Sequence, residues 1–254
     1  TLSASPNFGY ELCLRKIPDD VLDGLDLSSW RMAFNGAEPV SPETIVNFTQ
    51  RFARYGLQPE TIAPVYGLAE CSVGLAFPPP GRRPLIDRIK REKFARSGQA
   101  DPAGGEDADI LRFVSCGRPL PGHQIKIVDA TGNEVGERVE GHLEFKGPSA
   151  TSGYFRNPEQ NRLLFRDGWL NSGDFAYLAA GDLYLTGRAK DIIIRAGRNI
   201  HPHELEEAVG NIPGIRKGCV AVFGSPDPVS GTERLVVLAE MRDIDSRKYE
   251  ELRG

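Results

Sequence analysis

The sequence lacks several features that define large classes of protein. Its net charge of −4 provides no excess of Lys and Arg with which to bind nucleic acid or an anionic membrane surface. It contains no run of about 18 apolar residues, so we expect no transmembrane segment. Residues 1–10 lack the basic and apolar regions of a signal peptide. These absences favour a cytoplasmic protein with no nucleic-acid partner.

Cysteine is scarce, and the four cysteines are widely separated along the chain: Cys13, Cys71, Cys116 and Cys219. They form no CxxC pair and have no His in zinc-ligand spacing, so we interpret them as reduced thiols and predict no zinc site. The sequence also contains no Walker-type glycine loop, which argues against a generic Mg²⁺ phosphotransferase. The ordinary globular composition that remains allows one or two domains.

The first part of the chain has the pattern of an α/β fold. Residues 30–34 and 61–65 are typical of short buried strands, and the Ser-Pro pair at residues 41–42 predicts a helix start between them. A strand, a helix and a strand in this order favour a parallel sheet. The turns at residues 35–38 and 66–70 would then follow the carboxyl ends of the strands, where ligands bind in open α/β sheets.

The composition changes after residue 77. Residues 78–109 combine a Pro-rich turn, a basic stretch at 82–96 and a stretch rich in Gly, Ala and Asp, and they exceed the usual length of a connection. Short apolar runs separated by turn residues then predict a small antiparallel β-subdomain. Its expected strands are residues 111–115, 124–128 and 142–146.

The remaining elements are expected at both ends of the chain. Helices are expected over residues 8–17 (with no strand before it), from residue 157, over 201–209 and from residue 246, and strands at 183–185, 191–194, 219–223 and 235–240. The last of these elements form a segment of βαββ(α) type that is small for an independent domain.

The strongest chemical signal is the sequence PVYGLAE at residues 64–70. A Tyr-Gly turn at a sheet edge exposes an aromatic face for a purine, and a carboxylate four residues later suits Mg²⁺. Alone, the same residues would describe an ordinary turn capped by Glu. Further motifs accompany it in order: NGAEP (35–39), GHLEFKGP (141–148), SGYF (152–155), DGWLNSGD (167–174), LTGRAKD (185–191) and RAGRNIHPHE (195–204).

This ordered series resembles the adenylate-forming superfamily, which includes acyl-CoA synthetases, luciferases, peptide-synthetase adenylation domains and fatty acyl-AMP ligases. The resemblance implies an α/β protein with α+β parts. Residues 1–110 would be the C-terminal part of the α/β adenylation core, including an insertion near 78–109. Residues 111–186 would be the small β-rich subdomain, 187–190 a hinge, and 191–254 an incomplete α+β domain.

The resemblance also implies which residues bind the nucleotide of ATP. The backbone of Gly36, Ala37 and Glu38 would border the adenine. Tyr66 would stack against the adenine, with Gly67 completing the same turn. These residues lie on the two loops that follow the expected parallel strands.

Charged residues would hold the rest of the ATP molecule. Glu70 would be the catalytic carboxylate that binds Mg²⁺ between the phosphates, Asp174 would accept both ribose hydroxyls, and Arg188 would contact ribose or phosphate. Lys190 matches a hinge position, and Gly197 a channel for the acceptor's pantetheine arm. From the residues alone, Asp174 could also be an Asx-turn residue, and Arg188 and Lys190 solvated hairpin charges.

The implied reaction has two steps. A carboxylic acid attacks the α-phosphorus of Mg·ATP to give acyl-AMP and pyrophosphate, and the acyl group then passes to a thiol. The long stretch at 78–109, PNFGYELC (6–13) and SCGRPLPG (115–122) resemble the fatty acyl-AMP ligases, which transfer to the phosphopantetheine of an acyl carrier protein instead of CoA. Ala196 and the basic residues 82–96, which could form a solvated helix, depart from that branch.

Two alternatives to this interpretation stay open. One is an acyl-CoA synthetase that uses free CoA, and the other is a catalytically silent module that binds a nucleotide or acyl group. Two family elements are absent from the sequence, namely the Ser/Thr/Gly-rich phosphate loop with its Lys and the C-terminal catalytic Lys. We expect them before Thr1 and beyond Gly254, so residues 1–254 alone should not form adenylates.

Overall fold

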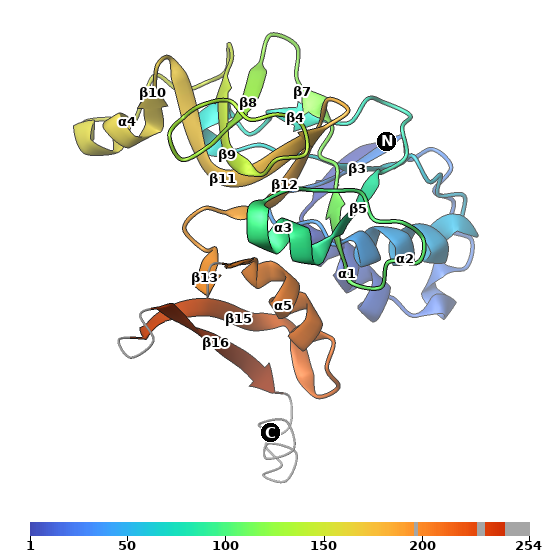
Figure 1. Ribbon diagram of the computed structural model, residues 1–254. Coiled ribbons are helices and arrows are strands. Elements are labelled where there is room, and N and C mark those ends of the chain that lie inside the picture. Colours follow the sequence, from blue (N-terminus) through green and yellow to red (C-terminus); the bar gives the residue numbers. More distant parts are fainter. Residues whose placement is uncertain (196–197, 228–231, 242–254) are drawn as a thin grey trace. The chain divides into compact units, whose positions relative to one another are not determined.

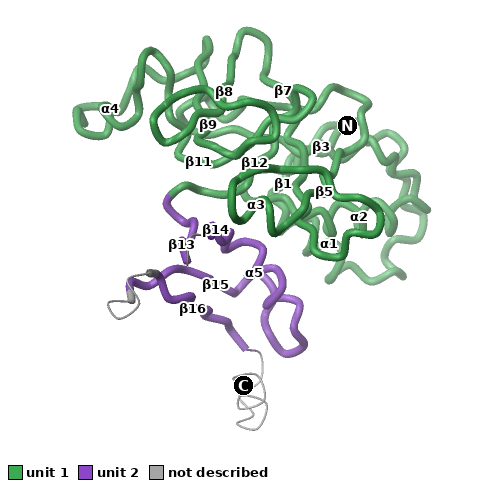
Figure 2. The backbone as a smooth tube through the Cα atoms, in the orientation of Figure 1, with its two compact units in different colours: residues 1–189 green, residues 190–254 purple. Residues whose placement is uncertain are grey.

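The computed structural model describes residues 1–195, 198–227 and 232–241. The chain divides into two compact units, Thr1–Ala189 and Lys190–Gly254 (Figure 2). No helix among the described residues is long and apolar enough to cross a membrane. The domain boundaries and the hinge at 187–190 stay predictions, and each unit is described by itself.

The first unit begins with a parallel three-stranded sheet in the order β1-β2-β3. Two helices, α1 and α2, pack on each other beside this sheet (Figure 1). The predicted parallel α/β arrangement is confirmed, but the absence of a strand before the first helix was wrong. The bounds are β1 Leu2–Ser5, α1 Asn7–Lys16, the 3-10 helix η1 Asp19–Leu22, β2 Met32–Asn35, α2 Pro42–Ala53 and β3 Ile62–Pro64.

Helix α2 starts where the Ser-Pro pair predicts. The Ser41 side chain accepts a hydrogen bond from the Thr44 N–H at 3.4 Å, which satisfies one of the free N–H groups of the first turn. The buried face includes Phe48, whose ring meets Tyr10 of α1 edge-on with centroids 5.1 Å apart. Each fully buried side chain of this size contributes about 1.5–3 kcal/mol of hydrophobic stabilisation. Capping and burial together explain why these residues form a helix.

The antiparallel β-subdomain has the strand order β10-β11-β9-β8, with β12 pairing β11. The long strand β11 is its centre, and it was not expected from the sequence. Helix α4 begins at Pro158 after the capping residue Asn157, as predicted. The bounds are β8 Gln124–Val128, β9 Gly141–Lys146, α4 Pro158–Leu164, β10 Phe165–Arg166, β11 Trp169–Ala179 and β12 Asp182–Arg188.

Residues 78–109, the predicted insertion and called the insertion below, contain a strand that the sequence did not reveal and a short helix, which was one interpretation of the basic stretch. Strand β5 (Ile86–Lys90) pairs antiparallel with β6 (Ile110–Val114), and helix α3 (Arg91–Ser97) follows β5 directly. The basic side chains pair with acidic neighbours: Arg91–Asp109 at 2.6 Å, Lys93–Asp101 at 2.5 Å and Arg96–Glu92 at 2.9 Å. Local carboxylates thus compensate much of the charge of this stretch.

The insertion is fixed to the β-subdomain by an apolar cluster. Ile89 and Phe94 are fully buried and pack with Tyr177 and Tyr184 of β11 and β12, whose rings stack with centroids 5.0 Å apart. The Tyr177 hydroxyl donates a hydrogen bond to Asp87 at 2.8 Å. Two short strands, β4 (Ala76–Phe77) and β7 (Arg118–Pro119), and the 3-10 helix η2 (Ala69–Cys71) complete the first unit.

The second unit contains one helix and two antiparallel strand pairs in its described part. The pair predicted from residues 219–223 and 235–240 is confirmed, since Val222 lies opposite Val237. The helix expected from residue 246 lies outside the described residues. The bounds are β13 Ile193–Arg195, β14 Arg198–Ile200, α5 Pro202–Gly210, β15 Ile215–Asp227 and β16 Thr232–Met241.

Candidate functional site

The loops that follow β2 and β3 lie side by side, as parallel strand ends require. The Val65 N–H donates to the Asn35 carbonyl at 2.9 Å. A Cβ atom on Gly36 would lie 2.8 Å from the Val65 carbonyl oxygen, so the close approach of the two loops requires glycine. Ala37 adopts φ 67°, a left-handed conformation. On the same loop, the Glu38 carboxylate accepts a hydrogen bond from the Phe8 N–H.

The turn that starts at Tyr66 folds back on itself. The Tyr66 N–H donates to the Ala76 carbonyl at 2.9 Å. A Cβ atom on Gly67 would lie 1.5 Å from the Val73 carbonyl oxygen, so no other residue fits there. Ser72 (φ 48°) and Val73 (φ 75°) are both left-handed, and this is a strained conformation for a β-branched residue. The strain lies within three residues of Glu70.

Tyr66 and Asp174, which are 108 positions apart, are joined by a hydrogen bond. The Tyr66 hydroxyl donates to Asp174 Oδ2 at 2.6 Å. Burial, followed by the Asp174 charge, raises the pKa of Tyr66 far above its ordinary value, so the hydroxyl stays a donor. Arg188 on β12 is the cross-strand partner of Asp174 on β11. Side chains at such positions start about 4.5–5.5 Å apart, so the structure brings Tyr66, Asp174 and Arg188 together.

Glu70 extends from η2 and meets a residue to which the sequence analysis gave no role. The Tyr154 hydroxyl donates to Glu70 Oε1, and the Thr151 N–H donates to the Glu70 carbonyl at 2.7 Å. The hydrogen bond to Glu70 raises the pKa of Tyr154. Tyr154 lies in the SGYF motif at 152–155, which was the one signal that could have pointed to it.

The donor set around Glu70 fits Mg²⁺ only in the company of a nucleotide. Among the described residues, no group of three or more His, Cys, Asp or Glu side chains could hold a metal ion. Mg²⁺ in nucleotide sites takes one or two carboxylates and completes its octahedron with phosphate oxygens and water. A single carboxylate of the Glu70 kind matches that requirement.

The two other predicted positions, Lys190 and Gly197, lie outside the first unit. Lys190 is exposed and is the first residue of the second unit. Gly197 lies outside the described residues. The hinge role of Lys190 and the acceptor-channel role of Gly197 stay predictions.

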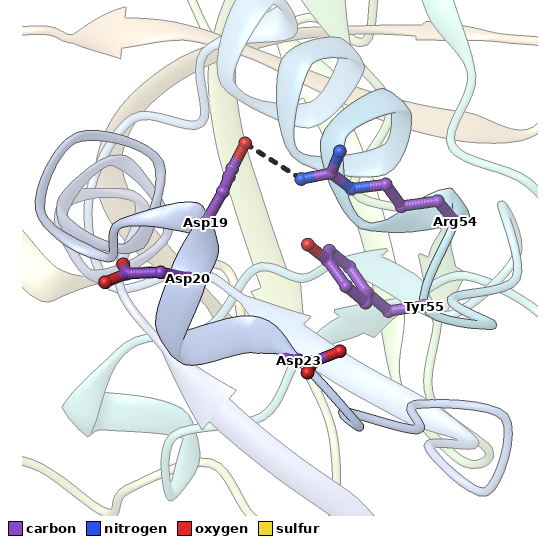
Figure 3. A pocket seen from close by; sticks show the side chains of 5 residues that line it. All are labelled: Asp19, Asp20, Asp23, Arg54 and Tyr55. Atoms are coloured by element: carbon purple, nitrogen blue, oxygen red, sulfur yellow. Dashed lines mark ion pairs between the residues drawn. The ribbon is translucent and has the colours of Figure 1, made fainter.

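A separate hollow of about 640 Å³ contains none of the predicted residues (Figure 3). Asp19 at its edge accepts hydrogen bonds from Arg51 and Arg54, each at 2.9 Å, and these bonds lower the pKa of Asp19. The charges of Asp19 and Arg54 are therefore used in local ion pairs, and we assign no ligand to the hollow. It is lined by Asp19, Asp20, Asp23, Arg54 and Tyr55.

Comparison with known proteins identifies the family. A family model described as AMP-binding enzyme matches residues 2–155, which is more than half of the chain. The chain belongs to this family. The resemblance to adenylate-forming enzymes and the mixed α/β fold class are thereby confirmed. The relatives in this family include a protein named as a long-chain-fatty-acid–AMP ligase.

Individual relatives agree with this assignment. The "Putative acyl-CoA synthetase" of Caulobacter vibrioides is 38% identical over 97% of this chain and 44% of its own length. The "Medium-chain-fatty-acid--[acyl-carrier-protein] ligase JamA" of Moorena producens is 33% identical over 95% of this chain and 42% of its own. A structure from studies of fatty acyl-adenylate ligases from E. coli and L. pneumophila has a TM-score of 0.91 and 36% identity, covering 98% of this chain and 44% of that one. This chain thus spans less than half the length of these relatives.

Proposed function

We propose that this AMP-binding chain belongs to a ligase that converts a fatty or other carboxylic acid to acyl-AMP and pyrophosphate. The 2.6 Å hydrogen bond between Tyr66 and Asp174 carries this proposal. This bond holds an aromatic ring beside a carboxylate whose two oxygens can accept hydrogen bonds from both hydroxyls of a ribose. Adenine on the ring and ribose on the carboxylate are then two ends of one nucleoside.

The remaining residues complete the proposed nucleotide site. The backbone of Gly36, Ala37 and Glu38 borders the adenine, and Gly67 allows the turn that presents Tyr66. Arg188, opposite Asp174, supplies a permanent cation for ribose or phosphate. Each group acts by holding ATP where the substrate carboxylate can attack its α-phosphorus.

Glu70 is the proposed Mg²⁺ ligand. The bound ion would neutralise charge on the phosphates as pyrophosphate leaves. The backbone of Glu70 is held by η2 and by the hydrogen bond from the Thr151 N–H to the Glu70 carbonyl. It takes no proton in the reaction, and its contribution is electrostatic.

The experiment that tests the proposal is ATP–pyrophosphate exchange by the intact gene product with fatty acids of several lengths. Exchange that requires both fatty acid and Mg²⁺ is expected. No exchange with any carboxylic acid, despite AMP binding, would favour the silent nucleotide-binding module instead. We expect residues 1–254 alone to show no exchange, because they contain no Ser/Thr/Gly-rich phosphate loop with a Lys.

We further propose an acyl carrier protein as the acceptor. The support is the insertion, whose strand and helix are fixed to the β-subdomain, together with the carrier-protein ligase among the relatives. The resemblance to fatty acyl-AMP ligases implies that such an insertion restrains a domain rotation needed for the use of CoA. The relative named as an acyl-CoA synthetase favours the second candidate, transfer to CoA.

The acceptor is tested by supplying fatty acid and ATP with either CoA or a holo carrier protein. The expected result is thioester on the carrier protein and acyl-AMP alone with CoA. Ready formation of an acyl-CoA would refute the carrier-protein proposal and leave the first half-reaction intact. Cytoplasmic location is part of the proposal, and the four cysteines, none of which is in a disulfide in the structure, fit a reducing compartment.

A further inference from the structure

Residues 149–154, here called the brace, run beside the turn that contains Glu70. Hydrogen bonds attach the brace to this turn. Three hydrogen bonds between the two segments end on backbone carbonyls, and Cys71 Sγ lies 3.4 Å from Ser149 Oγ. The bond from the Thr151 N–H joins the two backbones directly, and the two serine hydroxyls add bonds from side chain to backbone. The bonds are Ser149 Oγ to Cys71 O (3.1 Å), Ser72 Oγ to Ser149 O (3.1 Å) and Thr151 N to Glu70 O (2.7 Å).

A histidine fixes the first end of the brace. His123 Nε2 lies 2.7 Å from Ser149 Oγ, and its Nδ1 lies 3.3 Å from the Pro121 carbonyl oxygen. A Cβ atom on Gly147 would lie 2.2 Å from the His123 ring, so glycine is needed for the ring to reach Ser149. The ring is thus built into the fold behind the Glu70 turn.

The side chain of Asn161 on α4 fixes the other end. Asn161 Oδ1 accepts from the Tyr154 N–H at 2.6 Å, and Asn161 Nδ2 donates to the Tyr154 carbonyl at 3.1 Å. Gly153 has φ 129° and approaches the Asn161 amide so closely that a Cβ atom would lie 2.9 Å from Oδ1. Both backbone polar groups of Tyr154 are therefore held, and its hydroxyl reaches Glu70 Oε1.

We propose that Tyr154 is a positioning residue for the Glu70 carboxylate, held in place by the brace. This inference rests on the proposed role of Glu70 as a Mg²⁺ ligand. The terminal torsion of a glutamate is soft, and a hydrogen bond to Oε1 restricts it. In the part of the chain that the structure describes, Oε2 accepts no hydrogen bond, so one oxygen is held while the other can bind the metal. Partners of this kind orient metal ligands, and their loss typically costs about 10–100-fold in metal affinity.

The test compares ATP binding by the intact gene product with and without Mg²⁺, measured by calorimetry. Tyr154→Phe is expected to raise the Kd for Mg·ATP about 10-fold and to leave the Kd for ATP in EDTA within about twofold. Glu70→Gln should raise the Kd for Mg·ATP at least as much. Tyr55→Phe removes a hydroxyl just beyond the end of α2, in a different apolar cluster from the one that holds the Tyr66 turn, and should change neither Kd.

A second variant and a folding measurement separate positioning from general damage. Asn161→Ala frees the Tyr154 backbone and should weaken Mg·ATP binding in the same direction, with an unchanged Tm confirming that each variant folds. If Glu70→Gln weakens Mg·ATP binding but Tyr154→Phe and Asn161→Ala both leave it unchanged, the inference is overturned. Equal losses with and without Mg²⁺ would also overturn it. If Glu70→Gln itself has no effect, the proposed metal role of Glu70 fails.

Discussion

One ion pair attaches the start of the insertion to the β-subdomain, and it gives a sharp test of what holds the first unit together. Arg82 Nη1 lies 2.8 Å from Asp182 Oδ2 and 3.1 Å from Oδ1. The Asp182 side chain is only 4% exposed, whereas Arg82 is 25% exposed. Arg82→Ala therefore leaves a nearly buried carboxylate with Arg118, at 3.4 Å, as its remaining partner.

The magnitude follows from burial. Removing one partner of a fully buried pair costs about 3–5 kcal/mol. Because Arg82 is partly exposed and Arg118 compensates, we expect Arg82→Ala to lower the free energy of unfolding by about 2–3 kcal/mol. The adjacent Arg83 provides a matched control, since its pair with Glu60 is 3.9 Å long and largely exposed. Arg83→Ala should cost less than about 0.5 kcal/mol.

Urea unfolding followed by tryptophan fluorescence is the assay. Both tryptophans, Trp30 and Trp169, lie in the first unit, so the signal reports on that unit even if the second unfolds separately. With a slope of about 2 kcal/mol/M, Arg82→Ala should move the midpoint down by about 1 M. If its midpoint matched that of Arg83→Ala, the reasoning from burial would be refuted.

Three further outcomes are expected. Asp174→Ala should weaken AMP binding in EDTA at least 10-fold, about 1.4 kcal/mol, and calorimetry showing unchanged affinity would remove Asp174 from the nucleotide site. Gly67→Ala should prevent the native turn and lower the Tm, whereas Gly136→Ala, with no atom within 4 Å of the added Cβ, should not. Burial raises the pKa of Cys116 to about 12, so its thiol should resist a thiol reagent at pH 8 while the Cys219 thiol reacts. The contribution of Cys116 to the free energy of unfolding should fall as the pH rises from about 9, the pKa in the unfolded chain, towards 12, because only the unfolded thiol ionises in that range.

Local signals were enough to predict several elements. The Ser41-Pro42 and Asn157-Pro158 starts were correctly placed because a cap depends on residues within one turn of the helix. The strand at 124–128 was also placed correctly, since its turns are local. Strand β1 was missed because it has only four residues and they are mostly exposed, which gives a weak local signal. Its existence depends on pairing with β2, about 30 positions further along.

The insertion shows why other elements could not be predicted. Its sequence is dominated by basic residues and breakers, and Ile89 and Phe94 are its two large side chains that are fully buried. Those two side chains form a core with Tyr177 and Tyr184, which come from strands more than 80 positions away. Because most of this core comes from distant strands, the insertion itself needs few apolar residues. Its own sequence therefore shows little apolar periodicity from which a strand or helix could be predicted.

The sequence by itself determined the family, the parallel arrangement of the first strands and the identity of the proposed nucleotide residues, because each is written in short motifs whose order along the chain is itself informative. Tertiary structure alone decided which of these residues meet. Tyr66 reaches Asp174 across 108 positions, and Tyr154 reaches Glu70 across 84. Such contacts depend on the fold of everything between the two residues, and neither partner's neighbours in the sequence contain that information.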